Sequence, residues 1–231
     1  MKELIPLIQS YTRNSINIIK DLQKINIPKG AIIFSANAIS MYTNIETETG
    51  LATIKDLLKE EADKISPHFP SDLFINILEI VMKNNVFTFG DTYWLQKSGT
   101  AMGTPAACAY ATISFGHYEN KHILTTFSDN LIYYKRYIDD IFNIWLPPAK
   151  NKQSIWNAFK RALNGWGKLQ WIIEEPSSHT VFLDLDITLK NSKILTKTFQ
   201  KNMNLYLFIP PTSAHPLSCL KGLITSEMRQ Y

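Results

Sequence analysis

Apolar residues in the first part of the chain fall into one continuous run and several helix-spaced sets. Residues 31–36 form a short, mostly apolar run, which is typical of a buried strand. Apolar side chains recur at roughly helical spacing over residues 1–27, 48–62 and 71–82. Spacing of this kind places the apolar side chains on one face of a helix. We therefore expect one buried strand among three amphipathic helices.

The second part of the chain changes more often between strands and helices. Two apolar stretches flank Gly90-Asp91 and indicate a hairpin over residues 86–95, and a helix of small residues is expected after Pro105. Further strands are predicted over residues 131–134, 141–145, 169–174, 180–189 and 193–200, with a helix over 151–164. Because strands and helices do not alternate strictly, the pattern favours an α+β fold with an antiparallel sheet and helices on one face.

Composition places the chain among globular proteins. Its 231 residues are 45% apolar and 19% charged, enough to bury a core in one large domain or two small ones. The net charge of +4 is weak support for a nucleic-acid partner. No stretch is apolar enough to span a membrane, and the two cysteines form no CxxC pair, so we expect an intracellular location. The densest positive stretch either lines a phosphate track or forms a solvated face; it contains Lys190, Lys193, Lys197 and Lys201.

Two adjacent carboxylates, Asp139 and Asp140, follow Tyr137-Ile138 between two apolar strands. Adjacent carboxylates at a hairpin tip repel each other, and such a turn normally takes Asn-Gly or Asp-Gly. A divalent cation would neutralise them, because Mg²⁺ prefers hard oxygen ligands. A pair of such ions stabilises the attacking and leaving oxygens of a phosphoryl displacement. The tetrapeptide alone predicts either a metal site or an ordinary acidic turn.

Two other segments combine a loop with the start of a helix. Residues 34–45 run from a strand through a polar turn into a helix. Residues 96–105 contain Gly99 and Gly103 ahead of a helix. Glycine lets the backbone approach a ligand closely, and free N–H groups at a helix start suit a phosphate. Taken alone, these glycines are better explained by the geometry of the loop.

Together the three segments resemble reverse transcriptases, especially those of Penelope-like retroelements. Residues 34–45 are similar to the strand of motif A in that family. The run Gly-Thr-Ala-Met-Gly-Thr-Pro at residues 99–105 is similar to motif B, and residues 137–140 to motif C. The order and spacing also match, and the resemblance covers nearly the whole chain. It implies a polymerase palm.

The resemblance implies that Asp139 and Asp140 are catalytic and hold two Mg²⁺ ions, or Mn²⁺ in their place. The aspartate of the family's motif A falls on Asn37, which makes Asn37 a degenerate catalytic position. A neutral amide leaves two anionic ligands where the family has three. We expect weaker metal binding and a slower reaction, since each ~1.4 kcal/mol of barrier is tenfold in rate.

The resemblance also implies that Tyr42, Met102 and Gly103 bind the nucleotide. Tyr42 lies where the family places an aromatic ring under the sugar, and a ring there excludes a 2′-hydroxyl. Gly103, with Met102 beside it, would border the incoming nucleotide. Taken alone, Tyr42 is better explained as a core aromatic residue after a strand.

Three parts are implied along the chain. Residues 1–30 correspond to partial fingers with an entry helix, and residues 31–200 to the palm with inserted fingers helices. Residues 201–231 correspond to the start of the connection to a thumb that is largely missing. Full fingers and the endonuclease domain of many relatives are also missing, which predicts a fragment of a longer reading frame.

Two functions remain open. The first is RNA-templated DNA synthesis with an RNA template, a DNA primer and deoxynucleoside triphosphates, impaired by Asn37. The second is a catalytically dead retroelement relic that at most binds nucleic acid. An RNA-dependent RNA polymerase shares the palm and the paired aspartates, and Tyr42 argues against it. Whether this copy is an enzyme therefore stays open, and a nuclear location is expected only for a functional copy.

Overall fold

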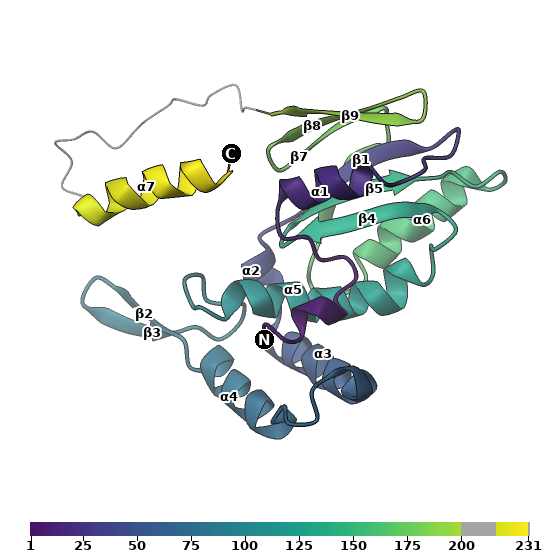
Figure 1. Cartoon of the computed structure of the whole chain (residues 1–231). Coiled ribbons are helices and arrows are strands. Elements are labelled where there is room, and N and C mark those ends of the chain that lie inside the picture. The colour runs from purple at the N-terminus through teal and green to yellow at the C-terminus, as the bar shows by residue number, and fades with distance from the viewer. Residues whose placement is uncertain (200–215, 231) are drawn as a thin grey trace. The chain divides into compact units, whose positions relative to one another are not determined.

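A four-stranded antiparallel sheet forms the centre of the larger of two units. The computed structural model describes residues 1–199 and 216–230, and the chain divides into Met1–Phe199 and Gln200–Tyr231. The central sheet has the order β4-β5-β1-β6 (Figure 1). Its strands are β1 (Ile32–Ala38), β4 (Leu131–Tyr137), β5 (Asp140–Trp145) and β6 (Trp171–Ile173). The hairpin of β4 and β5 therefore pairs with β1, which comes much earlier in the chain.

Two helices cover one face of the central sheet, and a third packs on the outside of them (Figure 1). The two are α5 (Ala107–Tyr118), which continues directly into a π-helix over Glu119–Leu124, and α6 (Lys152–Leu163). The third is α3 (Thr47–Glu60), which packs against α5. Their buried side chains form one core with the sheet, which includes Phe34, Ile54, Phe115, Ile141, Trp145, Trp156 and Phe159. This arrangement confirms the predicted α+β fold with helices on one face of an antiparallel sheet.

The opposite face carries α1 (Ser15–Leu22) and a small antiparallel sheet in the order β7-β8-β9. The strands of the small sheet are β7 (His179–Phe182), β8 (Leu185–Lys190) and β9 (Lys193–Thr198). A second core lies between these elements and the central sheet; it includes Ile18, Leu22, Ile33, Phe142, Ile144, Phe182 and Ile187. Strand β5 therefore contributes alternate side chains to two cores, which explains its continuous apolar run.

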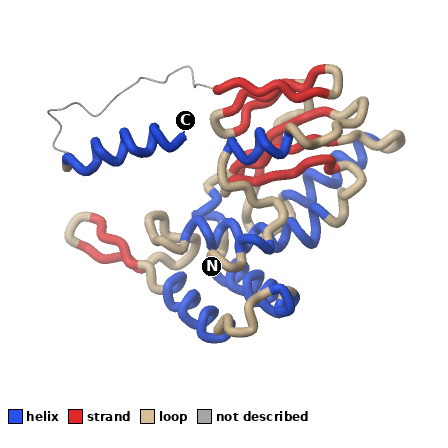
Figure 2. The backbone as a smooth tube through the Cα atoms, viewed as in Figure 1, coloured by secondary structure: helices blue, strands red, loops and turns tan. Residues whose placement is uncertain are grey.

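Helix α4 (Ser71–Lys83) and the hairpin of β2 (Val86–Phe89) and β3 (Thr92–Leu95) extend away from the central sheet (Figure 2). The remaining short elements are α2 (Met41–Asn44) and 3-10 helices over Ile5–Leu7 and Ala62–Lys64. Every residue of β2 and β3 is exposed. The hairpin presents large apolar side chains on both faces; these are Val86, Phe87, Phe89, Tyr93, Trp94 and Leu95. An isolated two-stranded ribbon is marginally stable at best, so this surface favours association.

We expect the apolar hairpin to make the chain self-associate, and the double substitution Phe89→Lys and Tyr93→Lys to reduce that association. Both side chains are more than three-quarters exposed, at 78% and 79%, so the change should alter the unfolding free energy by less than about 0.5 kcal/mol. Sedimentation velocity over a concentration series measures the effect. The control adds the same charge on exposed polar positions, Gln153→Lys and Ser154→Lys. Equal association in both variants would contradict a role of the hairpin.

Two expected elements differ from the structure. The prediction of a single strand over residues 180–189 is wrong, because the chain turns at Leu183 and Asp184 between β7 and β8. Leu183 has φ 54°, a conformation that usually takes Gly or Asn, so the sequence carries no signal for this turn. The prediction of a helix throughout residues 1–27 is wrong for residues 8–14. That segment lies along the edge of β4 instead, where Tyr11 pairs with Arg136.

Asn143 is fully buried in the middle of β5, on the same side of the strand as Ile141 and Trp145. Neither polar atom of its side-chain amide has a hydrogen-bond partner among the described residues. Burying an unpaired polar group costs about 1–3 kcal/mol. We expect Asn143→Leu to raise the free energy of unfolding by that amount, measured by urea denaturation. Asn143→Asp is the matched opposite change and should destabilise the chain, because it buries a charge at the same position.

The smaller unit contains α7 (Leu217–Gln230). Lys201 and most of the expected connection to a thumb lie outside the described residues. In the larger unit, Lys190, Lys193 and Lys197 are exposed on the hairpin of β8 and β9. No helix in the described part of the chain is both long and apolar enough to cross a membrane.

Candidate active site

The end of β1 meets the start of β5, which brings Asn37 beside the two aspartates. Asn37 is the register partner of Asp140, and its amide Nδ2 donates to Asp140 Oδ1 over 2.6 Å. The backbone N–H of Ala38 donates to the carbonyl of Asp139 over 2.8 Å. The Asn37 side chain is exposed, so this edge of the sheet is open to a ligand. Residues 103 positions apart in the sequence therefore share one site.

A tight turn carries the aspartates. Tyr137 and Asp140 are register partners, so Ile138 and Asp139 alone connect β4 to β5. Ile138 has φ 51°, in the left-handed region. A β-branched residue rarely adopts this conformation, which costs on the order of 1–3 kcal/mol and persists only when the surroundings enforce it. The direction of both carboxylates thus depends on a strained residue.

Tyr42 connects the turn after β1 to the loop before α5. Its backbone carbonyl accepts from the N–H of Thr100 over 2.6 Å, and its hydroxyl lies 3.2 Å from the Sγ of Cys108 on α5. Gly99 has φ 83°, and a Cβ built there would lie only 2.9 Å from the Tyr42 carbonyl. A side chain at position 99 would therefore push the two segments apart, which explains why this position takes glycine.

The Tyr42 side chain is half-buried and lies close to the acidic turn. Burial raises the pKa of its hydroxyl first, followed by the Cys108 contact and the negative charge of Asp139. The phenol therefore stays protonated at neutral pH. Tyr42, Asn37, Asp139 and Asp140 come from the segments that the sequence assigned to motifs A and C, and Cys108 follows motif B. The structure gathers all three segments at one place.

Met102 and Gly103 lie in the loop between the hairpin and α5, and both are exposed. They line a groove of about 520 Å³ together with Val86 and Phe87 of β2. Gly103 has φ 96°, and a Cβ there would meet no atom within 4 Å, so backbone conformation rather than crowding requires glycine.

A second groove, of about 530 Å³, borders the acidic turn. Tyr137 and Ile138 of the turn line it with Cys108 and Arg13. Pro105 lines this groove and also the one that contains Met102 and Gly103. The structure thus places Met102 and Gly103 in a groove that shares Pro105 with the groove at the turn, rather than against the two carboxylates.

Basic side chains surround a third groove, of about 300 Å³, between α1 and β4. It is lined by four cationic residues and one acidic residue, which are Arg13, Lys20, Lys24, Lys135 and Asp21. Arg13 and Tyr11 also line the groove next to the acidic turn, so the two grooves adjoin. Basic grooves of this kind attract a phosphate backbone.

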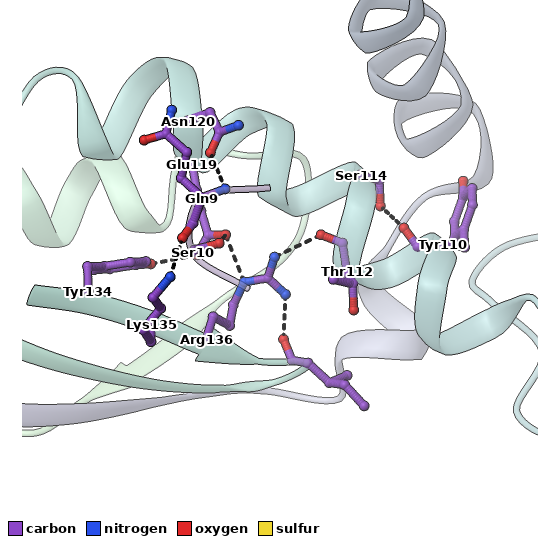
Figure 3. A network of polar contacts seen from close by, with 11 residues as sticks. Gln9, Ser10, Tyr110, Thr112, Ser114, Glu119, Asn120, Tyr134, Lys135 and Arg136 are labelled. Atoms are coloured by element: carbon purple, nitrogen blue, oxygen red, sulfur yellow. Dashed lines mark hydrogen bonds and ion pairs between the residues drawn. The ribbon is translucent and has the colours of Figure 1, made fainter. Parts of the chain in front are cut away.

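Sequence reasoning missed a buried ion pair, shown in Figure 3, whose arginine donates a hydrogen bond to the backbone of the acidic turn. Arg136 Nε donates to Glu119 Oε2 over 2.8 Å, and the two residues are 1% and 0% exposed. A signal was present, because Arg136 lies two residues after Tyr134 and therefore on the same, inward face of β4. An inward-facing arginine requires a buried acceptor. Glu119, 17 positions earlier, could not be identified as that acceptor without the fold.

The donor set at the turn fits a divalent cation in part. Asp139 and Asp140 supply hard anionic oxygens, and the Asn37 amide supplies a neutral oxygen next to them. Among residues 1–199 and 216–230, no cluster of three His, Cys, Asp or Glu side chains is placed to hold a metal. With asparagine at position 37, two carboxylates would carry any cation bound here.

Comparisons with known proteins identify the fold. No family model matches the chain, and no curated protein does. Among solved structures, apo telomerase from Candida tropicalis, truncated from its C-terminal domain, matches with 15% identity and a TM-score of 0.62, over 84% of this chain and 43% of that one. Telomerase from Candida albicans with a fragment of telomeric RNA matches with 11% identity and a TM-score of 0.61, over 83% and 37%.

Viral polymerases match as well. The RNA-dependent RNA polymerase of BmCPV at the elongation state shares 13% identity with a TM-score of 0.57, over 83% of this chain and 19% of that one. The chain thus spans about two fifths of the telomerases and about a fifth of the viral enzyme. These likenesses show that it has the fold of a polymerase palm.

Proposed function

We propose that this chain is the reverse transcriptase palm of a retroelement, of the Penelope-like kind, and that it extends a DNA primer on an RNA template. The observation that carries the proposal is the meeting of Asn37, Asp139 and Asp140 at the edge of a polymerase-like sheet. Asp139 and Asp140 would hold divalent cations. Bound cations of this kind stabilise charge on the phosphoryl group during transfer.

Tyr42 supports deoxynucleotides as substrates. Its hydroxyl contacts the Sγ of Cys108 on α5, and its half-buried side chain lies close enough to Asp139 for that negative charge to raise the pKa of the hydroxyl. A ring fixed there limits the space beside a bound sugar. Structural likeness to viral RNA polymerases alone leaves the sugar open, so Tyr42 carries this part of the proposal. Met102 and Gly103, in the adjoining groove, would contact the nucleotide or its template partner.

Nucleic-acid partners are supported by charge. The basic groove with Arg13, Lys20 and Lys135 adjoins the groove at the acidic turn, as a path for a phosphate backbone requires. In this proposal residues 1–30 belong to the fingers, residues 31–200 form the palm, and residues 201–231 lead toward a thumb. A functional copy would act in the nucleus.

The competing proposal is a relic without catalytic activity that at most binds nucleic acid. Asn37 favours it, because the amide donates its N–H to Asp140 where a metal-binding residue would present an anionic oxygen. The two proposals share the fold and the basic groove. The two proposals differ in whether two carboxylates can hold the cations well enough for primer extension.

Primer extension by the full chain separates the two proposals. The assay uses a DNA primer on an RNA template with Mg²⁺ or Mn²⁺ and either deoxynucleotides or ribonucleotides. The control is the double variant Asp139→Asn and Asp140→Asn. Metal-dependent extension with deoxynucleotides, lost in the control, supports the polymerase. Binding of the primer–template without extension in any variant supports the relic. A preference for ribonucleotides would overturn the role of Tyr42.

A further inference from the structure

All three nitrogens of the Arg136 guanidinium group donate hydrogen bonds, and one of these bonds reaches the acidic turn (Figure 3). Its Nε donates to Glu119 Oε2 over 2.8 Å. Its Nη2 donates to the carbonyl of Thr112 on α5 over 2.9 Å, and its Nη1 donates to the carbonyl of Ile138 over 2.7 Å. The planar, rigid fork of arginine fixes these three acceptors relative to one another. Arg136 therefore ties the turn to the helix layer.

The Ile138 carbonyl is the critical acceptor. Ile138 is the strained residue of the turn, with φ 51°, and Asp139 follows it directly. A hydrogen bond from a charged donor contributes more to stability than one from a neutral donor. Its contribution is similar in size to the cost of holding a β-branched residue in the left-handed region. The bond from Arg136 can thus offset the strain that points the carboxylates.

Glu119 in turn holds Arg136 in place. Its Oε1 accepts from the Tyr134 hydroxyl and its Oε2 accepts from the Ser10 hydroxyl, both over 2.6 Å. The backbone of the N-terminal segment closes the network, since Arg136 N–H donates to the Ser10 carbonyl over 2.6 Å and the Thr12 N–H donates to the Arg136 carbonyl. Every oxygen of the buried carboxylate is therefore satisfied, as burial of a charge requires.

The packing around the guanidinium leaves little freedom. Its carbon lies 5.2 Å from the centre of the Phe115 ring, which favours a cation. A Cβ at Gly116 would lie 3.2 Å from Nη2 and 2.3 Å from a methyl group of Ile8. Glycine at position 116 thus leaves room for both the guanidinium and the N-terminal segment. The site is shaped for arginine.

We propose that Arg136 is a positioning residue: by holding the Ile138 carbonyl it fixes the direction of the Asp139 and Asp140 side chains. Glu119 in turn fixes the position of the Arg136 guanidinium group. The assignment rests on the proposed function only in taking these two carboxylates as cation ligands. Conformation of the turn and binding of a cation are therefore measured separately, so that either can fail alone.

The variants change the bond to Ile138 while keeping the fold. Arg136→Lys keeps the charge next to Glu119 but has one donor centre in place of a fork. The double variant Arg136→Met and Glu119→Leu removes the ion pair as a whole, which is often neutral for stability. Lys135→Met is the matched control, because Lys135 is adjacent in β4 but donates to the Gln9 carbonyl at an exposed site.

The first measurement is the conformation of residue 138 by NMR, from the intraresidue amide–Hα Overhauser effect that marks positive φ. We expect a strong effect in the unsubstituted chain and in Lys135→Met, and a weakened one in both Arg136 variants. Positive φ that persists in folded Arg136 variants would overturn the proposal. This measurement needs no cation and does not depend on the proposed function.

The second measurement is Mn²⁺ affinity by titration calorimetry, with Asp139→Asn as the zero reference. We expect Arg136→Lys to weaken binding by about tenfold or more, as loss of residues that orient metal ligands does. Adding Ile138→Asn to Arg136→Lys should restore most of the affinity, because Asn adopts the left-handed region readily. Absence of rescue would mean that Arg136 acts in some other way. Absence of Mn²⁺ binding to the unsubstituted chain would overturn the metal role of the aspartates, while the NMR result still decides the role of Arg136.

Discussion

Replacing Asn37 with aspartate is expected to make the stability of the chain depend on divalent cations. In the structure the Asn37 amide donates to Asp140 over 2.6 Å. Asn37→Asp removes this donor and places a second carboxylate against the first. Like charges at that distance repel, so without metal the variant should lose about 1–2 kcal/mol of unfolding free energy. A cation at 100 times its dissociation constant should add back about 2.7 kcal/mol.

Thermal unfolding in EDTA and in Mn²⁺ measures this effect. The unsubstituted chain should show a smaller difference between the two conditions than Asn37→Asp. Asn37→Ala is the control, because it loses the same hydrogen bond and adds no charge, so it should be destabilised equally in both conditions. An Asn37→Asp variant that melts at the same temperature with and without Mn²⁺ would contradict a shared cation site.

The same substitution should also raise the rate of primer extension. One more anionic ligand should hold the cations more tightly, and bound cations stabilise charge on the transferring phosphoryl group. We expect an effect on the order of 100-fold, as when one oxyanion-hole donor is removed from another active site. Single-turnover extension isolates the chemical step. Equal and measurable rates in the two proteins would mean that position 37 does not act on the metal. Equal and absent rates would leave the relic proposal standing.

The largest loss of stability is expected from Glu119→Leu. This substitution leaves the Arg136 guanidinium, 1% exposed, without its carboxylate, and it removes the acceptor of Ser10 and Tyr134. Removing one partner of a buried pair costs about 3–5 kcal/mol, since an uncompensated charge remains. Urea denaturation followed by far-UV circular dichroism measures the change.

A double-substitution cycle identifies the cause. Adding Arg136→Met to Glu119→Leu removes the stranded charge and should recover most of the lost free energy. Surface pairs provide the comparison: Lys64→Met breaks an exposed pair with Glu61 and should cost at most about 1 kcal/mol. If the double variant is as unstable as Glu119→Leu alone, packing rather than charge holds this region together.

Elements with strong periodicity could be predicted from the sequence. The helices at α3, α4 and α6, the hairpin at residues 86–95 and the strands around the aspartates all follow from local spacing. The turn at Leu183 could not be predicted, because a leucine in the left-handed region carries no turn signal. The extended course of residues 8–14 was hidden too, since its pairing with Arg136 lies far along the chain.

The candidate site divides in the same way. Two adjacent aspartates between apolar strands indicate either a metal site or an ordinary acidic turn without any structure, and the motif resemblance favours the metal site and adds Asn37, Tyr42, Met102 and Gly103 to it. The hydrogen bond from Asn37 to Asp140, the Tyr42–Cys108 contact and the separate groove of Met102 and Gly103 needed the tertiary structure. Each depends on which segments pack together.

The sequence by itself determined which chemistry is available: two carboxylates at a hairpin tip, and an asparagine that the motif resemblance assigns to the same site. These properties depend only on residue types and their neighbours in the chain, so they can be read directly from the sequence. Only the tertiary structure decided how that chemistry is held, through Arg136 between Glu119 and the Ile138 carbonyl. A buried ion pair forms between segments that come together when the helix layer packs on the sheet, so no local pattern could predict its partners.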